Sequence, residues 1–444
     1  MKLSSLSLSA GHFVRARWHW KHLHGESLRQ YQEVRAQQIV NYAQQHSAFY
    51  REHWSQHDPH AWRTLPVVNK QLMMQHFDTF NTRSVQLDDA MQVALRAEQS
   101  RDFLPQLAEL TVGLSSGTSG HRGLFLVSPQ EQASWAGAIL ARTLHDLKPR
   151  RLRVAFFLRS NSNLYEEVGK GLIQFRYFDL MTPLAEAVQT LNRWQPHIVI
   201  GPPSLLGLLA DEQARGDLHV RPERLISVAE VLEAHDRERL QKTFGIPVHQ
   251  IYQCTEGFLA TSCVKGSLHM QEDLVAVQFE AIPGSNGERV MPIITDLWRQ
   301  TQPIIRYQLN DILELERTPC ACGSTFQVIR SIDGRCDDLC YFVSNDGALR
   351  PFFPDTIRRM ILLASSQILD YQVIQEQHGH LRIHLSVTKL ASFASICQTV
   401  QASVDATIAQ YSCRAAKIQI EEGLPVLAAG VKRRRVQCVQ ATHQ

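Results

Sequence analysis

This sequence of 444 residues predicts an α/β fold, with a large N-terminal domain of mixed and parallel sheets with covering helices and a small C-terminal α+β domain. Short apolar runs alternate with helical segments from about residue 110 onward, and after about residue 340 the pattern changes to shorter elements. Such alternation implies a mostly parallel sheet covered by helices, with ligand sites at the carboxyl ends of the strands. We place the large domain at residues 1–337 and the small domain at residues 339–444.

The N-terminal part of the large domain is expected to be helical. Residues 1–105 form this helical entry segment, and Gln30 to Tyr50 repeats apolar residues at the spacing of an amphipathic helix. Trp18 and Trp20 have basic neighbours, so contact with a membrane is an alternative for this segment. We interpret it as a helix that packs on the rest of the domain.

The strands of the large domain are expected where short runs of mostly apolar residues occur. Four such runs are Leu152–Leu158, His197–Ile200, Leu225–Val228 and Val248–Tyr252. The turn Gly201–Ser204 contains two prolines and opens a helix that is predicted to span Leu205 to Gln213. These elements supply the parallel sheet and one of its covering helices.

Charge and cysteine content argue against several classes of protein. The formal charge of +3 gives no electrostatic case for binding nucleic acid. No apolar stretch is long enough to span a bilayer, and serines interrupt the N-terminus in a way that argues against a signal peptide. Nine cysteines, an odd number, favour cytoplasmic thiols or a metal site over a disulfide framework.

A loop rich in glycine and hydroxyl side chains, Ser115–Gly123, directly follows an apolar run that is expected to be a strand. Glycine lets backbone amides approach an anion, and hydroxyl groups add donors around phosphate oxygens. The spacer and the Gly-Lys-Ser/Thr ending of a Walker A loop are missing. The stretch has the chemistry of a polyphosphate cradle, although a flexible surface loop explains it equally well by itself.

Four later motifs carry side chains that suit a nucleotide. Tyr252 and Glu256 end an expected strand, where a ring can stack on a base and a carboxylate can hold Mg²⁺; a core aromatic is the plainer interpretation of Tyr252. Asp311 can accept both ribose hydroxyls, with a surface Arg–Asp pair as the alternative. Arg335 lies in a polar segment where the composition changes. Lys432 can neutralise charge on a carboxylate and a phosphate, but its basic cluster in isolation is better explained as a solvated tail.

In this order and at these distances, the motifs resemble the adenylate-forming superfamily over nearly the whole chain. The resemblance is greatest to the phenylacetate-CoA ligase branch and to the synthetases that adenylylate a deazaflavin coenzyme. Residues 41–51 and 65–70 look like the N-terminal signature of that branch. One departure is that His121 and Arg122 stand where the family's phosphate loop usually has lysine.

The resemblance implies an enzyme that uses ATP and Mg²⁺ to activate a small-molecule carboxylic acid, expected to be an aryl acid. It releases pyrophosphate, forms an acyl-adenylate and transfers the acyl group to a thiol, with coenzyme A as the expected acceptor. A carrier-protein thiol and a homodimer are left open. The alternatives are AMP transfer onto a coenzyme or other acceptor without a thioester, and a non-catalytic nucleotide-binding homologue.

The resemblance also implies roles for single residues in the large domain. The loop would bind the β- and γ-phosphates of ATP through Ser115, Ser116, Gly117, Thr118, Ser119 and Gly120. Glu230 occupies the place of a strand end that contacts adenine, on which Tyr252 would stack. Thr255 would contact the α-phosphate, and Glu256 would bind Mg²⁺.

A second group of residues would complete the nucleotide site from the end of the large domain and from the small domain. Asp311 would hold the ribose hydroxyls, and Arg335 would support the nucleotide. Lys432 would bridge the carboxylate and the α-phosphate. Asp337 and Asp338 would form the hinge about which the small domain turns between the two half-reactions.

Three cysteines and a histidine form a candidate metal site. Cys263 and His269 follow the Glu256 motif, and Cys320 and Cys322 come about fifty residues later. Three thiolates and one imidazole make a closed tetrahedral site, which is the structural kind of zinc site. Four unrelated buried residues are the alternative. Because some members of the phenylacetate-ligase branch carry a comparable set, we expect one structural Zn²⁺ per chain.

Overall fold

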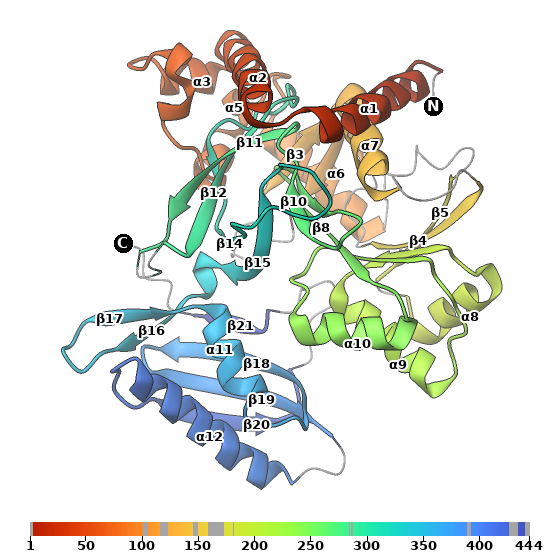
Figure 1. The fold of residues 1–444 in the computed structure, drawn as a ribbon. Coiled ribbons are helices and arrows are strands. Elements are labelled where there is room, and N and C mark those ends of the chain that lie inside the picture. Colours follow the sequence, from red (N-terminus) through yellow and green to blue (C-terminus); the bar gives the residue numbers. More distant parts are fainter. Residues whose placement is uncertain are drawn as a thin grey trace. The chain divides into compact units, whose positions relative to one another are not determined.

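The fold is that of a computed structural model, drawn in Figure 1. The structure describes residues 3–100, 105–115, 123–144, 150–158, 173–180, 182–283, 285, 287–388, 392–425 and 434–439. The chain divides into two compact units. The first holds residues 1–279, 293–309 and 315–330, and the second holds residues 280–292, 310–314 and 331–444.

The N-terminal segment of the first unit is built of helices. They are α1 (Leu3–His22), α2 (Gly25–His46), α3 (Ala48–His53), the 3₁₀ helix η1 (Pro59–Thr64), α4 (Lys70–Gln75), α5 (Phe77–Phe80) and α6 (Leu87–Ser100). Ser47 separates α2 from α3, because its N–H closes the first helix on Ala43 and its hydroxyl accepts the N–H of Tyr50. The predicted helix between Gln30 and Tyr50 is therefore two helices that meet at a capping serine.

The main sheet of the first unit confirms the predicted strands. Its order is β5-β4-β6-β7-β8-β9-β10-β15. The bounds are β4 (Leu152–Leu158), β5 (Ile173–Asp179), β6 (Ile198–Gly201), β7 (Arg224–Ser227), β8 (Val248–Cys254), β9 (Gly257–Ser262), β10 (Leu268–Met270) and β15 (Val328–Arg335). Strands β5 to β8 are parallel, and β9 and β10 continue the sheet antiparallel. The mixed sheet puts the carboxyl ends of β7 and β8 side by side.

Helices bury both faces of this sheet, which explains why its strands are mostly apolar. They are α7 (Pro129–Thr143), α8 (Leu184–Trp194), α9 (Pro203–Arg215) and α10 (Ala234–Phe244). Val199 packs with Leu206 of α9 and Leu240 of α10, whereas Ile198 and Ile200 face the cluster that holds Ile139 of α7. A parallel strand buried on both sides has no polar face. Helix α9 begins at the second of the two prolines that predicted it.

Smaller elements complete the first unit and lead into the second. Strands β1 (Gln106–Leu107), β2 (Leu110–Leu114) and β3 (Leu124–Val127) form a separate antiparallel sheet. Strands β11 (Val275–Ala281), β12 (Arg289–Asp296), β13 (Tyr307–Gln308) and β14 (Asp311–Leu315) lie where the chain passes between the units. These strands continue the main sheet beyond β15 in the order β14-β12-β11, with β13 paired to β12. The backbone crosses between the units within β11, β12, β14 and β15, and once between β13 and β14.

The second unit has the α+β composition that the sequence predicts. The hairpin β16 (Cys340–Val343) and β17 (Leu349–Phe352) follows the 3₁₀ helix η3 (Cys336–Asp338). A four-stranded sheet has the order β20 (Lys417–Glu422), β19 (His380–Val387), β18 (Ile368–Gln377) and β21 (Val436–Cys438). Helices α11 (Pro354–Leu362) and α12 (Phe393–Gln410) contribute Ile357, Val400 and Val404 to one core with Val373 and Ile383 of this sheet.

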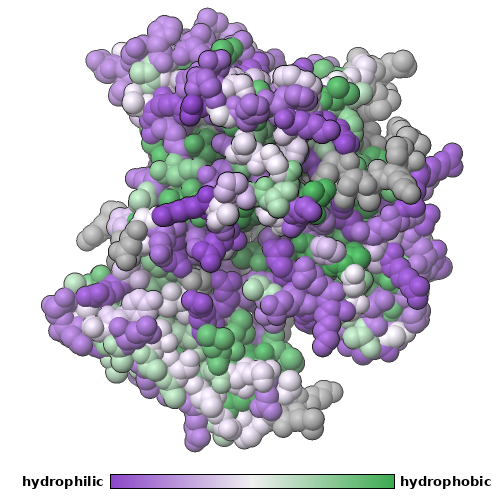
Figure 2. All heavy atoms as spheres, viewed as in Figure 1, coloured by the Kyte–Doolittle hydropathy of each residue, from purple (hydrophilic) through white to green (hydrophobic). Residues whose placement is uncertain are grey.

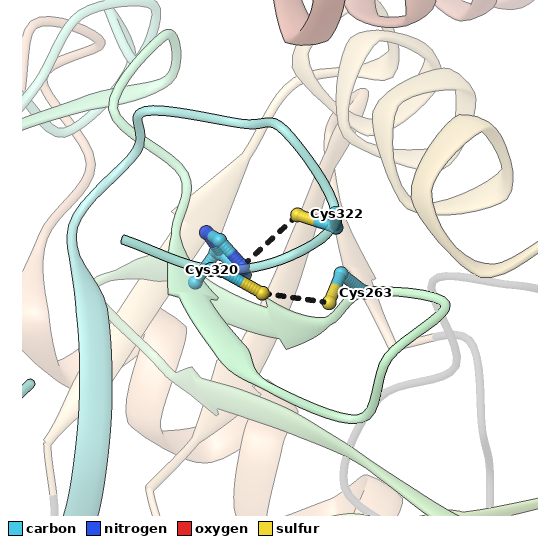
Figure 3. Close-up of side chains that lie close together, drawn as sticks. Cys263, Cys320 and Cys322 are labelled. Carbon is cyan, nitrogen blue, oxygen red and sulfur yellow. Dashed lines mark hydrogen bonds between the residues drawn. The ribbon is translucent and has the colours of Figure 1, made fainter. Parts of the chain in front are cut away.

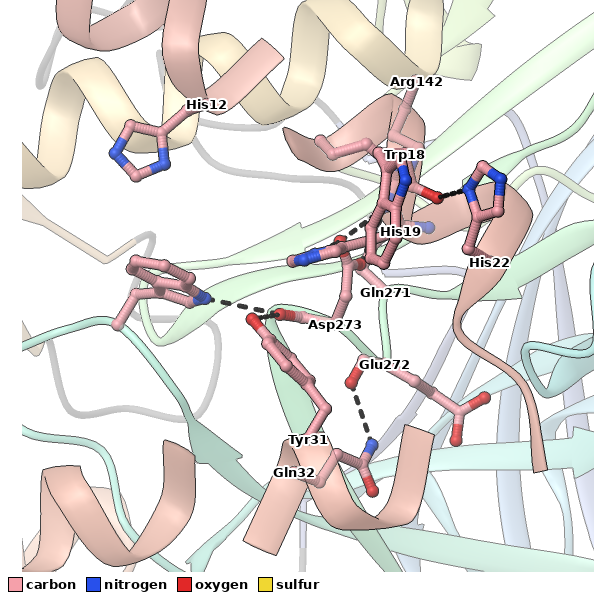
Figure 4. Close-up of polar contacts among 12 residues, drawn as sticks. His12, Trp18, His19, His22, Tyr31, Gln32, Arg142, Gln271, Glu272 and Asp273 are labelled. Atoms are coloured by element: carbon pink, nitrogen blue, oxygen red, sulfur yellow. Dashed lines mark hydrogen bonds and ion pairs between the residues drawn. The ribbon is translucent and has the colours of Figure 1, made fainter. Parts of the chain in front are cut away.

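A buried polar network fastens α1 and α2 to the sheet (Figure 4). Its centre is Asp273, whose carboxylate is inaccessible to solvent and accepts two hydrogen bonds from Arg142 of α7, at 2.8 and 2.9 Å. His19 of α1 lies 3.1 Å from the same carboxylate, and Tyr31 of α2 donates to the Asp273 carbonyl at 3.1 Å. Burial alone would raise the pKa of Asp273, but Arg142 and His19 hold this pKa below its usual value.

Helices α1 and α7 pack closely beside this network (Figure 1). A Cβ at Gly137 of α7 would lie 2.3 Å from the backbone oxygen of Ser9 in α1, so only glycine allows this approach. Among the described residues no helix has both the length and the apolarity needed to cross a bilayer. Figure 2 shows a viewed face that is largely hydrophilic, with apolar side chains scattered among the polar ones.

Candidate functional site

The candidate magnesium carboxylate lies in a tight turn at the carboxyl end of β8. Cys254 of β8 pairs with Gly257 of β9, so Thr255 and Glu256 form the two-residue connection between the strands. The side chain of Glu256 is almost fully buried, at 8% exposure. The register of one hairpin therefore places this carboxylate at the strand end where the sequence predicts it.

Both oxygens of the Glu256 carboxylate accept a hydrogen bond. The Thr255 hydroxyl donates to Oε2 at 2.8 Å, and the Tyr307 hydroxyl donates to Oε1 at 2.9 Å. Burial and the neighbouring Glu256 raise the pKa of Tyr307 well above its ordinary value of 10, so the phenol keeps its proton. Arg299 fixes the same turn by donating to the Thr255 carbonyl at 2.6 Å. The sequence analysis assigned no role to Tyr307 or Arg299, although Tyr307 lies only four residues before the candidate Asp311.

Glu230 follows the strand next to β8. Its carboxylate accepts the backbone N–H of Ser204 at 3.2 Å, and the preceding Ala229 has a positive φ of 69°. A left-handed alanine is an unfavourable conformation that packing must enforce, and such residues are enriched at functional sites. Since β7 and β8 are parallel neighbours, Glu230 and the Thr255–Glu256 turn both follow carboxyl ends of strands at one edge of the sheet.

The described ends of the phosphate loop are held together. The Ser115 N–H donates to the Gly123 carbonyl at 2.7 Å, and the Gly123 N–H donates to the Ser115 hydroxyl at 2.7 Å. A Cβ on Gly123 would lie 2.9 Å from Cε of Lys70, so the lysine side chain lies against this glycine. Lys70, at the start of α4, is a third residue to which the sequence analysis gave no role. The predicted phosphate-binding residues 116–120, together with His121 and Arg122, lie outside the described residues.

Tyr252 lies in β8 of the first unit, and the remaining candidate nucleotide residues belong to the second unit. Asp311 Oδ1 lies 3.5 Å from Nε of Arg335, so the structure brings these two predicted residues together. Asp338, at the predicted hinge, forms an ion pair with Arg434, and Asp337 lies in the same 3₁₀ helix η3. Lys432 lies outside the described residues.

The four candidate zinc ligands come together in the first unit (Figure 3). The ligand atoms of Cys263, His269, Cys320 and Cys322 all lie within 4.8 Å of one another. The Sγ atoms of Cys263 and Cys320 are 3.8 Å apart, and Sγ of Cys322 is 3.4 Å from Nε2 of His269. Cys263 follows β9, His269 lies in β10, and the other two cysteines lie in the loop before β15.

The surroundings of this cluster suit a metal. Nδ1 of His269 lies 2.9 Å from the Phe326 carbonyl, a contact that directs Nε2 toward the sulfurs. Burial lowers the pKa of His269 and raises the pKa of Cys322 to about 12. Three thiols and a neutral imidazole are the ligand types of a closed zinc site, and Zn²⁺ would replace the thiol protons. Trp20 of α1 packs edge-on against the His269 ring, at 5.2 Å between centroids.

Comparison of the sequence with known proteins identifies one relative over part of the chain. No protein-family model matches the chain. A phenylacetate-coenzyme A ligase of Thermus thermophilus is 25% identical over 212 residues, which make up 44% of this chain and 45% of that protein. The match spans about half the length of that curated relative.

Comparison with solved structures shows that the chain has the fold of adenylate-forming acyl-CoA ligases, as the resemblance predicts. The 2-hydroxyisobutyryl-CoA ligase in the postadenylation state with R3-HIB-AMP has a TM-score of 0.71 and 17% identity, covering 96% of this chain and 91% of that one. The anthranilate CoA ligase with anthranoyl-AMP has a TM-score of 0.50 and 14% identity, covering 74% of this chain and 67% of that one. At these identities the likeness establishes the fold.

Proposed function

We propose that this protein is an adenylate-forming ligase that activates a carboxylic acid with ATP and transfers the acyl group to coenzyme A. The observation that carries the proposal is the buried Glu256 carboxylate at the end of β8, in a chain whose fold matches a CoA ligase over 96% of its length. The partial match to a phenylacetate-coenzyme A ligase supports the same activity.

The reaction has two steps. A carboxylate oxygen of the acid attacks the α-phosphorus of ATP, the bond to pyrophosphate breaks, and an acyl-adenylate forms. The thiol of coenzyme A then loses its proton and attacks the acyl carbonyl, and AMP leaves. Attack of one anion on another requires positioning and neutralisation of charge more than covalent help.

The proposed roles follow the arrangement of the described residues. Glu256 holds Mg²⁺, which neutralises the phosphates when bound. Tyr252 of β8 and Glu230, which follows the parallel neighbour β7, contact adenine, and Thr255 after β8 contacts the α-phosphate. Lys70 lies against the base of the phosphate loop, where an ammonium group would add positive charge beside the phosphates.

The second unit supplies the remaining roles. Asp311 holds the ribose hydroxyls, and Arg335, which pairs with it, supports the nucleotide. Lys432 bridges the carboxylate and the α-phosphate during adenylation. Asp337 and Asp338 form the hinge that lets the unit leave the site before the thiol enters.

A structural zinc in the Cys₃His cluster is also part of the proposal. The short distances among the four ligand atoms and the contact that orients His269 support it. Elemental analysis of purified protein tests this point. About one zinc per chain is expected, and protein without stoichiometric metal would contradict it.

Acid-dependent release of pyrophosphate tests the activity. Purified protein is mixed with ATP, Mg²⁺ and a panel of aryl and aliphatic acids, and products are followed with and without coenzyme A. Lys432→Ala should lower adenylation by orders of magnitude, whereas Lys417→Ala, at an exposed lysine of the same unit, should not. Absence of acid-dependent pyrophosphate across the panel would overturn the proposal.

The same assay distinguishes the acceptors. A thioester of coenzyme A is expected because the similar proteins are CoA ligases. A stable AMP conjugate would show transfer onto another acceptor, and a product only with a carrier protein would show a carrier thiol. We place the protein in the cytoplasm because none of the nine cysteines, all of which the structure describes, forms a disulfide, as in a reducing compartment. Sedimentation of the purified chain tests whether it is a homodimer.

A further inference from the structure

Tyr307 places its hydroxyl on the Glu256 carboxylate. It lies in β13, 51 residues after Glu256, and its side chain is 1% exposed. A buried hydroxyl needs an acceptor, and a buried carboxylate needs donors. The phenol serves both needs with one bond of 2.9 Å.

The backbone around Tyr307 is fixed on the side of β13 that faces the N-terminal segment. The Val68 N–H donates to the Arg306 carbonyl at 3.0 Å, and the Gln308 N–H donates to the Val68 carbonyl at 2.8 Å. Tyr307 therefore pairs with Val68 in a short parallel bridge. A tyrosine held on both sides of its peptide can hold a carboxylate in one orientation.

We propose that Tyr307 is a positioning residue which, together with the Thr255 hydroxyl, orients the Glu256 carboxylate toward the cation that accompanies ATP. Each hydroxyl occupies one lone pair on one oxygen of the carboxylate. A carboxylate oxygen has a second lone pair, which stays available for Mg²⁺. The inference rests on the proposed function, because it needs Glu256 to be the magnesium carboxylate.

A structural role for Tyr307 makes a different prediction. If the hydroxyl only satisfied a buried group, its loss would lower stability and leave the effect of Mg²⁺ on ATP binding unchanged. Tyr50 is a matched control, because it is also fully buried and its hydroxyl donates to a backbone carbonyl, that of Pro303, at 2.9 Å. Tyr50→Phe removes an equally buried hydroxyl that has no contact with the carboxylate.

The experiment measures ATP binding by calorimetry without the acid substrate, once with excess Mg²⁺ and once with EDTA. The dissociation constant in EDTA divided by the dissociation constant in Mg²⁺ reports the coupling between metal and nucleotide. Tyr307→Phe should lower this ratio about tenfold, in line with the loss of a hydrogen bond to a charged group, and leave the affinity in EDTA within about twofold. Tyr50→Phe should leave the ratio unchanged.

A Tyr307→Phe variant that keeps the wild-type coupling would overturn the inference. If that variant does not fold, Thr255→Val tests the other hydroxyl of the same carboxylate, and an unchanged coupling there would have the same force. Failure of the proposed function is distinguishable, because the wild-type protein would then show no coupling between Mg²⁺ and ATP and no acid-dependent pyrophosphate.

Discussion

Replacing Asp273 by alanine should destabilise the first unit strongly. The Asp273 side chain is fully buried, and the Arg142 guanidinium that it binds is 3% exposed. Removing one partner of a buried ion pair leaves an uncompensated charge, which costs about 3–5 kcal/mol. In a unit of about 300 residues, this loss corresponds to a fall in Tm of about 5–8 °C. The hydrogen bonds from Arg142 to Gln271 and to Ala16 do not replace the lost negative charge.

Thermal unfolding followed by circular dichroism checks this magnitude. Glu26→Ala is the control, because it breaks the Glu26–Arg29 pair of α2, whose side chains are 64% and 69% exposed, and it should leave Tm nearly unchanged. The pKa of Asp273 is lowered, so its stabilisation is present at neutral pH and is lost as the pH falls through that pKa. A fall in Tm as small as that of the control would refute the reasoning.

Three further outcomes are expected. Burial raises the pKa of Asp296 from its ordinary value of 3.8 to about 6, so the stability of the wild-type protein should fall as the pH rises from about 4 to 6. In urea unfolding at pH 8, Asp296→Asn should be more stable than the wild type by on the order of 3 kcal/mol. An equal difference between variant and wild type at pH 4 and pH 8 would contradict this. Cys320→Ser should remove zinc and lower Tm, whereas Cys397→Ser, outside the cluster, should do neither; retained zinc in the first variant would count against the site. Lys70→Met should raise the KM for ATP about tenfold, as expected for a lost bond between charged groups. Lys242→Met, at an exposed lysine, should leave the KM unchanged. A Lys70→Met variant with the KM of the wild type would exclude Lys70 from phosphate binding.

The parts of the fold that the sequence predicts are those with a local cause. Strand β6 is apolar without interruption because it is buried on both faces, and this is visible in the sequence itself. The two prolines before Ser204 mark the start of α9 because proline suits a helix N-terminus. Cys320 and Cys322 are near neighbours in the sequence, whereas Cys263 and His269 lie about fifty residues earlier. The cluster was therefore predicted from the spacing of the cysteines together with the family resemblance.

The parts that were missed depend on contacts between distant residues. In the sequence, Tyr307 looks like an ordinary aromatic residue of the core. Only the fold brings its hydroxyl to Glu256, 51 residues away. Asp273 and His19 are separated by 254 residues, and neither lies in a pattern that predicts the other. Lys70 was part of a signature segment, yet its approach to Gly123 depends on how α4 packs beside the loop.

The long-range contacts of the N-terminal helices have a consequence for how the protein folds during its synthesis. Tyr50 finds the acceptor of its buried hydroxyl at Pro303, 253 residues later, and His19 finds its carboxylate at Asp273. At a translation rate of about 5–20 residues per second, the wait between Tyr50 and Pro303 is roughly 10–50 s. During this time Tyr50 and His19 lack their partners, so we expect these helices to reach their native packing only after residue 303 has been synthesised.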